Sequence, residues 1–312
     1  MSKPIRIGTR GSKLALWQAN HIADLLKKKG LESEIVIINT KGDRILDVSI
    51  AKIGSKGVFT EELEDQLSSG SIDIAVHSAK DLQSKLSDGF EIIAFTEREK
   101  ENDIILSHQT DIDYSNSNKP LLLGTSSTRR VATLRHFYPH IQTVDVRGNL
   151  QTRIAKMEAG LCDALLLAYA GAHRMGYDNL IRHELSLDEF TPAVGQGSVA
   201  IESSVNLDSD LKNQIVAACH HEATGYRLFA ERAYLRVLEG GCSIPVFALA
   251  ENQSGKLLLK GGILSLDGAK RIVHHVSGNA SQAEKLGEEL ARLVLESGGD
   301  DILKEIKSAL KK

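Results

Sequence analysis

Arginine residues are concentrated in one stretch of the chain. Between residues 124 and 156 there are six basic residues and one acidic residue, although the whole chain has a formal net charge of −3. They occur in two similar segments, Gly124-Thr-Ser-Ser-Thr-Arg-Arg130 and Arg147-Gly-Asn-Leu-Gln-Thr-Arg153. Each follows an expected strand and begins an expected helix, where backbone N–H groups and the helix dipole favour anions. With guanidinium groups added, both segments are suited to carboxylate or phosphate groups.

Either segment alone is more typical of a Ser/Thr helix cap followed by solvated charges. Two such segments at equivalent strand ends favour a ligand, because ligands of open α/β sheets bind at the carboxyl ends of the strands. Thr9-Arg10-Gly11-Ser12-Lys13 repeats the pattern after the first strand, and Arg174 follows a later apolar strand. This distribution predicts an anionic ligand with several carboxylates.

Two further segments contain groups that could react. His77-Ser-Ala-Lys80-Asp81 follows the third expected strand, and a carboxylate beside a lysine there can act as a base or stabilise a cation. A surface ion pair explains this segment equally well. Glu239-Gly-Gly-Cys242 places a thiol in a glycine-rich loop, whereas Cys162 is expected to fill the core. A lone cysteine is more often buried and inert, but the loop context makes a reactive role an equal alternative.

Composition limits the classes of function. The chain has 312 residues, 42% hydrophobic and 25% charged, which is typical of a globular protein with two or three domains. The low net charge and 4% aromatic content argue against nucleic-acid binding. Three cysteines without a C-x-x-C motif predict neither a disulfide framework nor a metal site. Because no apolar run approaches a membrane span and the N-terminus lacks a signal-peptide pattern, we expect a cytoplasmic protein.

The elements that must position these groups alternate between strand and helix. After a polar loop at residues 108–119 the same alternation begins again. This rhythm predicts two α/β units, each with a parallel sheet covered by helices on both faces. The expected strands are Ile5–Gly8, Glu34–Ile38, Ile72–Val76, Leu121–Gly124, Thr143–Val146 and Ala164–Ala168, and the expected helices are Leu14–Lys28, Thr60–Leu67, Arg129–His136 and Leu150–Ala159.

The pattern changes after about Asn213. Three strands joined by tight turns at Asn252–Gly255 and Asp267–Gly268 predict an antiparallel sheet in a small α+β domain. Gly195–Ala200 matches G-x-G-x-x-A but leads towards a strand, so a dinucleotide site is not expected. The expected elements are the strands Val246–Glu251, Lys256–Ser265 and Lys270–Ser277 and the helices Glu222–Leu238, Gln282–Glu296 and Ile302–Leu310.

Taken together, the motifs resemble one family, the porphobilinogen deaminases, also called hydroxymethylbilane synthases. They occur in the order typical of the family and cover nearly the whole chain, so their joint specificity is much higher than that of any one motif. Besides the segments quoted above, the matching stretches are Thr9–Leu16, Lys56-Gly-Val-Phe59, Ala170-Gly-Ala-His-Arg174 and Pro192-Ala-Val-Gly-Gln-Gly197.

The resemblance implies an α/β fold of three domains. Two would be similar to a type II periplasmic binding protein, and the third would be a small α+β C-terminal domain with a three-stranded antiparallel sheet. Domain 1 would comprise residues 1–98 and 197–216, domain 2 residues 99–196, and domain 3 residues 217–312. The active site would lie in the cleft between domains 1 and 2.

The resemblance also implies a cofactor and a reaction. Cys242 would carry a covalent dipyrromethane through a thioether. That cofactor primes the head-to-tail condensation of four porphobilinogen molecules, each losing ammonia, and hydrolysis then releases linear hydroxymethylbilane in tetrapyrrole (heme) biosynthesis. The protein would be a transferase, and no metal is implied.

The family pattern assigns roles to individual residues, and the acetate and propionate groups of porphobilinogen match the arginines noted above. Asp81 and Lys80 would be catalytic, with Asp81 stabilising an azafulvene-type cation. Lys56 and Phe59 would belong to a flap. The cofactor would be bound by Cys242, Lys80, Asp81, Ser127, Arg129, Arg130 and Gln18, and the substrate carboxylates by Arg10, Ser12, Arg147, Arg153 and Arg174.

The expected partner is porphobilinogen, and the expected state is a monomer that binds neither nucleic acid nor membrane. The alternative is a non-catalytic receptor for carboxylates with the same architecture, since a fold does not determine a function. The Gly-Gly-Cys242 loop in a third domain argues against this alternative, because a simple receptor needs neither the loop nor the domain.

Overall fold

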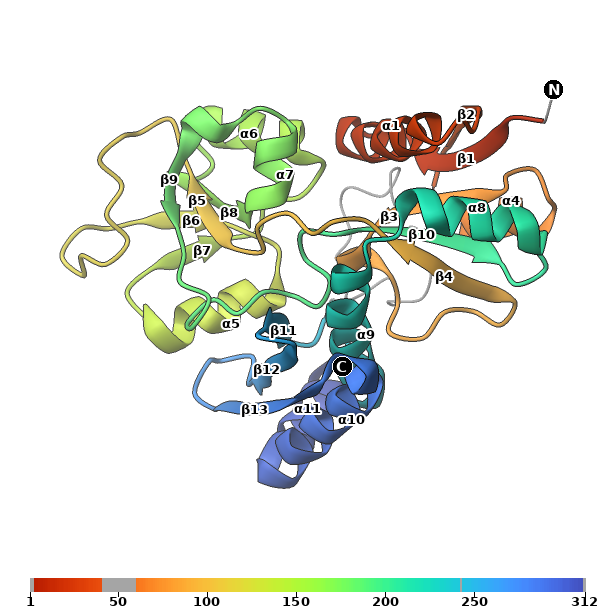
Figure 1. Cartoon of the computed structure of the whole chain (residues 1–312). Helices are drawn as coiled ribbons and strands as arrows, with labels where there is room; N and C mark the ends of the chain where they lie inside the picture. The colour runs from red at the N-terminus through yellow and green to blue at the C-terminus, as the bar shows by residue number, and fades with distance from the viewer. Residues whose placement is uncertain (1–2, 41–59, 242, 311–312) are drawn as a thin grey trace.

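Three β-sheets form the framework of the described chain (Figure 1). The structure is a computed structural model, and it describes residues 3–40, 60–241 and 243–310. Two five-stranded sheets with their helices lie side by side, and a three-stranded sheet with the C-terminal helices lies beneath them in the view of Figure 1. The predicted pair of α/β units and the predicted α+β unit with a three-stranded antiparallel sheet are therefore confirmed.

The first unit is built around the sheet β2-β1-β3-β10-β4. Its apolar strand faces pack against helices to form a core that includes Ile7, Ile22 and Ile74. The strands are β1 (Ile5–Arg10), β2 (Ser33–Ile38), β3 (Ile74–Ser78), β4 (Phe90–Phe95) and β10 (Val199–Ser204), and the helices are α1 (Lys13–Lys28), α4 (Glu61–Ser68) and α8 (Ser209–Cys219).

Helix α1 has two apolar surfaces. Ser12 caps its N-terminus, with Oγ accepting a hydrogen bond from the Ala15 N–H at 3.3 Å. Ala19, Ile22 and Leu26 are fully buried against the first sheet. Trp17 instead lies against the second unit, where the Arg174 guanidinium stacks over its ring at 4.9 Å. The helix therefore joins the core of one unit to the surface of the other.

The second unit repeats the arrangement of the first, with the sheet order β7-β6-β8-β5-β9. Parallel β7, β6 and β8 correspond in position to β2, β1 and β3. The strands are β5 (Asp103–Leu106), β6 (Leu122–Gly124), β7 (Gln142–Val144), β8 (Ala164–Ala168) and β9 (Ile181–Glu184), and the helices are α5 (Thr128–Phe137), α6 (Leu150–Glu158) and α7 (Tyr169–Arg174).

The expectation of purely parallel sheets is wrong. Strand β10 runs antiparallel to β3 and β4, and β5 runs antiparallel to β8 and β9. The reason is that the chain passes between the units twice, through residues 96–102 and 185–198. The first passage leads into β5, the first strand of the second sheet, and the second passage returns β10 to the sheet that β1 began. We call these stretches the crossing segments. We propose that the boundary between domains 1 and 2 lies in them.

The third unit consists of a long helix, a meander and two C-terminal helices. Glycine permits the two tight turns, since Gly255 and Gly268 have φ values of 80° and 75°. The predicted helix from Gln282 ends at Val294, and Gly298, at φ 101°, separates it from the last helix. The elements are α9 (Glu222–Val237), β11 (Val246–Gln253), β12 (Lys256–Leu264), β13 (Arg271–Asn279), α10 (Ala283–Val294) and α11 (Asp300–Leu310).

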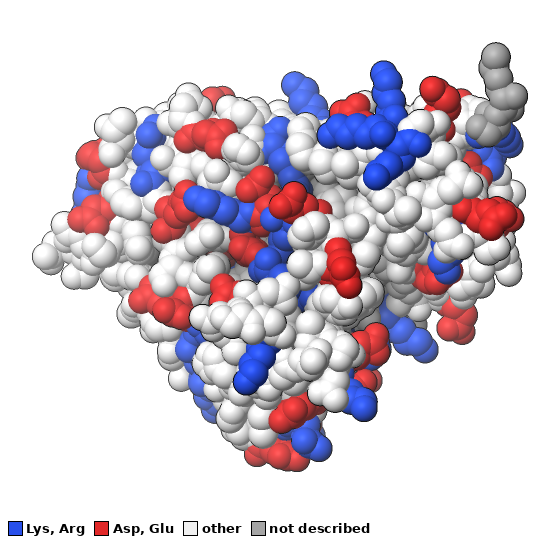
Figure 2. Space-filling model, in the orientation of Figure 1, with Lys and Arg blue, Asp and Glu red and all other residues white. Residues whose placement is uncertain are grey.

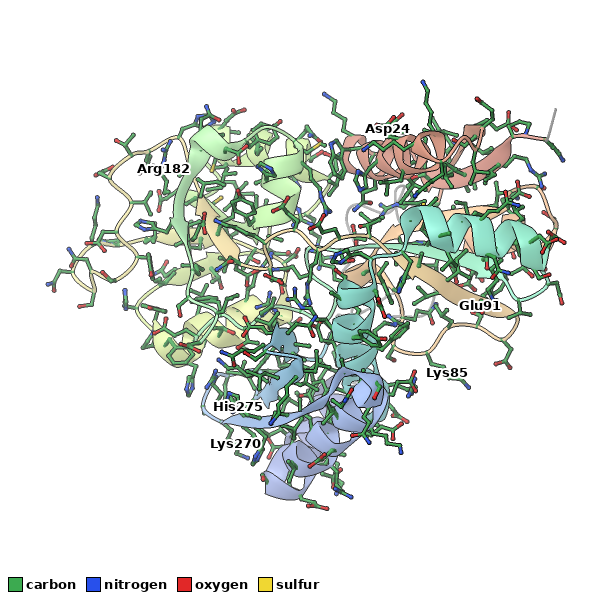
Figure 3. The ribbon with its side chains drawn as sticks, viewed as in Figure 1. Asp24, Lys85, Glu91, Arg182, Lys270 and His275 are labelled. Atoms are coloured by element: carbon green, nitrogen blue, oxygen red, sulfur yellow. The ribbon has the colours of Figure 1, made fainter. Side chains whose placement is uncertain are left out.

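The third unit contacts the second through the β12–β13 turn. Arg135 donates a hydrogen bond to the Leu266 carbonyl at 2.7 Å, and a His136 ring nitrogen lies 2.7 Å from the Gly268 carbonyl. Basic and acidic side chains are interspersed over the face shown in Figure 2, with several basic ones above α1. Exposed side chains such as Asp24, Lys85 and Lys270 lie on the outer surface (Figure 3).

Candidate functional site

The first wall of the candidate site lies at the carboxyl ends of β1 and β3. These strands run parallel, so the residues that follow them meet at one edge of the sheet. A cleft of about 80 Å³ opens there. Gln18, which is buried on α1, donates a hydrogen bond to the Ser78 hydroxyl at 2.8 Å. The residues lining this cleft are Arg10, Ser12, Leu14, Ala15, Gln18, Thr60, Val76, His77, Ser78 and Asp81.

The second wall contains two buried arginines held by a carboxylate. Ser127 caps α5, which brings Arg129 and Arg130 to the sheet edge. Arg129 lies 2.8 Å from one oxygen of Asp103, and Arg130 lies 2.7 Å from the other. Arg130 also donates to the Leu166 carbonyl at 3.0 Å. In the sequence, Asp145 is the one acidic residue among the arginines of residues 124–156. The antiparallel strand β5 brings a second negative charge to them, the buried Asp103.

Gln196 connects the two walls from a crossing segment. Its Nε2 donates to Asp103 at 2.9 Å and to the Glu101 carbonyl at 2.6 Å, and its Oε1 accepts from Lys80 at 3.5 Å. Burial and the nearby Arg130 charge lower the pKa of Lys80 to about 8, partly opposed by Asp81 and Asp103. The Lys80 amine therefore lies among charges from both units.

The other arginines differ in how they are held. Arg153 donates to the Gly148 carbonyl at 2.8 Å, and burial followed by the Arg130 charge lowers its pKa while the Asp81 charge raises it. It therefore lies within electrostatic range of the predicted catalytic carboxylate. Arg147 forms an ion pair with Asp145 at 2.8 Å.

Arg174 bridges the units. One of its terminal nitrogens donates to the Gly197 carbonyl at 2.7 Å, while its guanidinium stacks on Trp17. Burial lowers its pKa, and its Nε is buried without a hydrogen bond. Its position at the contact between α1 and α7 suits it to hold the units together, as well as to bind an anion.

Three predicted site residues, Lys56, Phe59 and Cys242, lie outside the described residues. Position 242 falls between α9 and β11. The two cysteines that are described, Cys162 and Cys219, are both free and buried, and burial raises the thiol pKa of each, that of Cys219 to about 12. Such thiols are inert at neutral pH, which agrees with the expectation that Cys162 fills the core.

Sequence reasoning missed Asp103 and Gln196. Asp103 begins a strand that the alternating pattern did not predict, although it is an acidic residue directly before an apolar run. Gln196 lies within the G-x-G-x-x-A match, which the structure confirms leads into a strand, β10. The sequence signal for Gln196 was its pair of flanking glycines, Gly195 and Gly197, whose positive φ values of 75° and 95° permit a tight turn.

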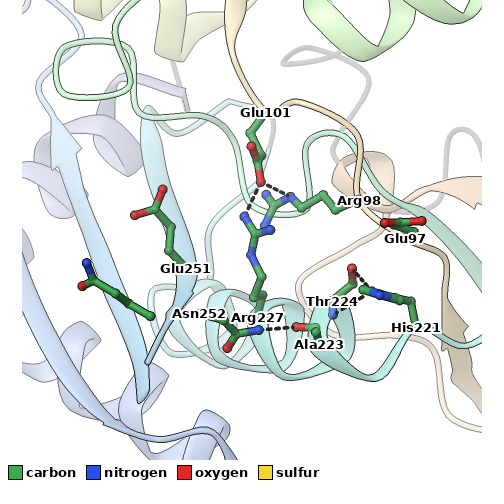
Figure 4. A pocket seen from close by; sticks show the side chains of 10 residues that line it. Glu97, Arg98, Glu101, His221, Ala223, Thr224, Arg227, Glu251 and Asn252 are labelled. Atoms are coloured by element: carbon green, nitrogen blue, oxygen red, sulfur yellow. Dashed lines mark hydrogen bonds and ion pairs between the residues drawn. The ribbon is translucent and has the colours of Figure 1, made fainter. Parts of the chain in front are cut away.

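A larger pocket of about 530 Å³ lies elsewhere, where the first crossing segment meets α9 and β11 (Figure 4). In it Arg227 forms an ion pair with Glu101, and Arg98 lies beside Glu101 at 3.5 Å. Because its arginines are paired with acidic groups, we assign this pocket to the junction between units. In the described part of the chain no cluster of acidic, histidine or cysteine side chains could hold a metal ion.

Fold and site together define the class of this protein. The two α/β units have the same sheet order, and Arg129, Arg130, Arg153 and Lys80 outnumber the carboxylates near them. The Arg129 Nε is buried and makes no hydrogen bond, so a donor remains unused. These residues fit an anionic group with several carboxylates.

Comparison with known proteins identifies the family. Residues 5–212 match the family model "porphobilinogen deaminase, dipyromethane cofactor binding domain", and residues 226–296 match the C-terminal domain of the same family. Porphobilinogen deaminase of Cytophaga hutchinsonii is 60% identical over 312 residues, all of both chains. That of Desulfosudis oleivorans is 55% identical over 97% of this chain and 98% of its own. The chain belongs to the porphobilinogen deaminase family.

Likeness to solved structures is partial. The VFT2 domain of Bordetella pertussis BvgS is 15% identical, with a TM-score of 0.44 over 69% of this chain and 85% of that domain. A substrate-binding domain of a putative amino acid transporter from Streptococcus pneumoniae gives 0.42 at 14% identity, over 69% and 91%. None of the described helices is long and apolar enough to cross a membrane.

Proposed function

We propose that this chain acts as a hydroxymethylbilane synthase of heme biosynthesis. It condenses four porphobilinogen molecules head to tail with loss of ammonia and releases linear hydroxymethylbilane by hydrolysis. The observation that carries the proposal is the link from Lys80, beside Asp81, through Gln196 and Asp103 to Arg130 in the other unit. Arg153 adds a further positive charge there, because the charges of Asp81 and Arg130 both affect its pKa. The basic side chains of such an arrangement bind the carboxylates of the growing polypyrrole, and the Asp81 carboxylate of the protein lies beside the bound rings.

The cofactor of the family is dipyrromethane, and the matched cofactor-binding model covers both walls of the cleft. When bound, this group supplies the pyrrole to which the first substrate is joined. We propose that Cys242 holds it through a thioether and that Arg129, Arg130 and Lys80 bind its carboxylates. Ser127 fixes the start of α5, and Gln18 fixes Ser78 on the opposite wall. The paired Asp103 keeps the two guanidinium groups in place without neutralising the cluster.

Asp81 is the proposed catalytic carboxylate. As the protonated amino group of the porphobilinogen aminomethyl substituent leaves as ammonia with the electron pair of the C–N bond, the methylene carbon stays and positive charge develops on it and on the substrate pyrrole. A carboxylate fixed beside the ring accepts the pyrrole N–H and stabilises that charge. Asp81 follows β3 in a single helical turn, Ala79–Asp81, and lines the cleft. Lys80 is proposed to assist as the neighbouring cation.

Substrate carboxylates are proposed to bind Arg10, Ser12, Arg147, Arg153 and Arg174. Arg10 and Ser12 line the first wall directly. Arg147 is paired with Asp145, whereas Arg174 uses the face of its guanidinium to stack on Trp17. We further propose that the chain acts as a monomer in the cytoplasm without nucleic acid, consistent with a net charge of −3.

Intact mass tests this function. Protein purified under native conditions should exceed its sequence mass by two pyrrole units and should convert porphobilinogen into hydroxymethylbilane with one ammonia released per condensation. A Cys242→Ser variant should have the bare mass and be inactive. Turnover by protein of bare mass would contradict the thioether. Reversible binding of porphobilinogen without ammonia release would favour a receptor instead.

A further inference from the structure

A buried imidazole–carboxylate pair lies directly behind the first wall of the cleft. His77 is on β3 and Glu202 on β10, and the register, with His77 opposite Ala200, places both on the same face of the sheet. His77 Nε2 lies 2.9 Å from Glu202 Oε2. The exposed fractions of the two side chains are 5% and 0%.

Polar contacts of this pair are otherwise missing. Among the described residues, neither His77 Nε2 nor either oxygen of Glu202 makes a hydrogen bond that satisfies geometric criteria. Glu202 is therefore buried against the His77 ring. Burial lowers the pKa of Arg232 to about 10, and the nearby Glu202 charge partly opposes this. Removing such a carboxylate from water is costly, and an apolar pair would fill the sheet more cheaply.

The His77 ring also lines the cleft that Asp81 lines. Nε2 lies against Glu202 Oε2, so Nδ1 is the ring nitrogen that is not in contact with this carboxylate. An imidazole held by a buried carboxylate and presented to a binding site is the arrangement of a general base and its orienting group.

We propose that His77 is a second proton-handling residue of the condensation and that Glu202 is its positioning residue. This inference depends on the proposed function. Asp81 accepts the N–H of the substrate pyrrole, but each condensation must also remove a proton from the α-carbon of the attacking ring. After the C–C bond forms, the α-carbon of the attacking substrate-derived ring bears both the new bond and its hydrogen. His77 takes that proton, the C–H electron pair restores the aromatic ring, and the proton passes to the departed ammonia, giving ammonium.

Porphobilinogen deuterated at its free α-carbon tests the assignment. The deuterium is removed only from the second addition onward, because in the first addition the ring that loses its α-proton is not a labelled one. In cofactor-loaded His77→Gln, the second and later ring additions should slow by about 10²-fold or more, as for loss of a general base. A primary deuterium isotope effect larger than that of the unchanged protein should appear, because proton removal becomes limiting. Glu202→Gln should change both quantities in the same direction but less. Mass spectrometry of the complexes should count fewer added rings at equal times.

His220→Gln is the matched control. His220 is a partly buried imidazole in the same unit, and its Nδ1 accepts a hydrogen bond from the Phe95 N–H at 3.2 Å, but it does not line the cleft. The isotope effect and the rate of ring addition in His220→Gln should equal those of the wild-type protein. Thermal unfolding should show that each variant is folded, and intact mass that it carries the cofactor. If His77→Gln does not fold, the rate and isotope effect of Glu202→Gln test the proposal instead.

A folded, loaded variant with an unchanged isotope effect would overturn the role of His77, even if its rate falls. Failure of the proposed function is distinguishable, because the unchanged protein would then consume no porphobilinogen.

Discussion

Asp103 shows how one residue can set the state of several others. It is fully buried, and its two oxygens contact Arg129 and Arg130 while one of them also accepts from Gln196. Burial raises the pKa of its carboxyl, but the two guanidinium charges outweigh burial and hold the pKa well below its usual range. The carboxylate is therefore charged at every pH at which the enzyme works, and the two arginines have fixed positions.

Replacing Asp81 tests the proposed catalytic carboxylate. Asp81→Ala should lower kcat by about 10²–10³-fold, equivalent to about 3–4 kcal/mol, because the developing cation loses a preorganised charge. The rate of bilane formation gives kcat, and intact mass shows whether the cofactor is still present. Asp88→Ala changes an exposed aspartate of the same loop and should have no effect. Near-normal turnover in a cofactor-loaded Asp81 variant would remove the assigned role.

Lys80 predicts a pH dependence of stability for the protein without cofactor. Its pKa is lowered from 10.5 to about 8, chiefly by burial and then by Arg130. Between these values the unfolded chain binds more protons than the folded chain, so the Lys80 contribution to the free energy of unfolding rises with pH. The free energy of unfolding of the wild type minus that of Lys80→Met should therefore increase as the pH rises from about 8 to 10.5. A difference that stays flat in denaturant titrations would show that the ammonium is not desolvated.

At the scale of elements, helix caps at strand ends determine where the arginines lie. Ser12, Ser127 and Asn149 cap α1, α5 and α6, and each cap follows the strand or turn that leads into the cleft. The cap fixes the first turn of the helix, and Arg129, Arg130 and Arg153 all lie within or next to a first turn. Capping therefore serves both helix stability and ligand geometry.

A matched pair of caps separates these two contributions. Asn149 accepts from the Thr152 N–H at 2.9 Å at the cleft, and Asp208 accepts from the Leu211 N–H at 2.9 Å on α8, away from it. Either residue changed to Ala should lower the free energy of unfolding by about 1 kcal/mol. KM for porphobilinogen should rise only in Asn149→Ala, because only α6 carries Arg153. Equal KM values in both variants would contradict a role for α6 in binding.

At the scale of the whole molecule, Glu231 joins all three units. It is fully buried on α9 and accepts from Arg98 at 2.5 Å, from the Gly195 N–H at 2.9 Å and from the Ala250 N–H at 2.9 Å. Arg98 in turn donates to the Gln196 carbonyl at 2.8 Å. Both crossing segments and β11 thus meet at one carboxylate, and this junction continues through Gln196 to Lys80 and Asp103.

Breaking this junction should affect the entire molecule. Glu231→Gln removes the closer counter-charge of the buried Arg98 and leaves it only Glu101, at 3.5 Å, which should lower the free energy of unfolding by about 3–5 kcal/mol. The control is Glu184→Gln, which breaks an exposed pair with Lys100 and should leave the free energy of unfolding almost unchanged. Urea unfolding measures both values. Similar losses in the two variants would mean that Glu231 is not a central connection.

The sequence by itself determined the repeated strand–helix order, the third unit and the strand-end segments that carry Arg10, Asp81, Arg129 and Arg153, because these features depend on local periodicity and caps. Only the tertiary structure decided which charges meet. Asp103 pairs with Arg130 across 27 residues of sequence, and Gln196 reaches Asp103 across 93. These contacts arise from the two antiparallel strands that the crossing segments insert, β5 and β10. Such pairing is non-local, so no local pattern in the chain could predict it.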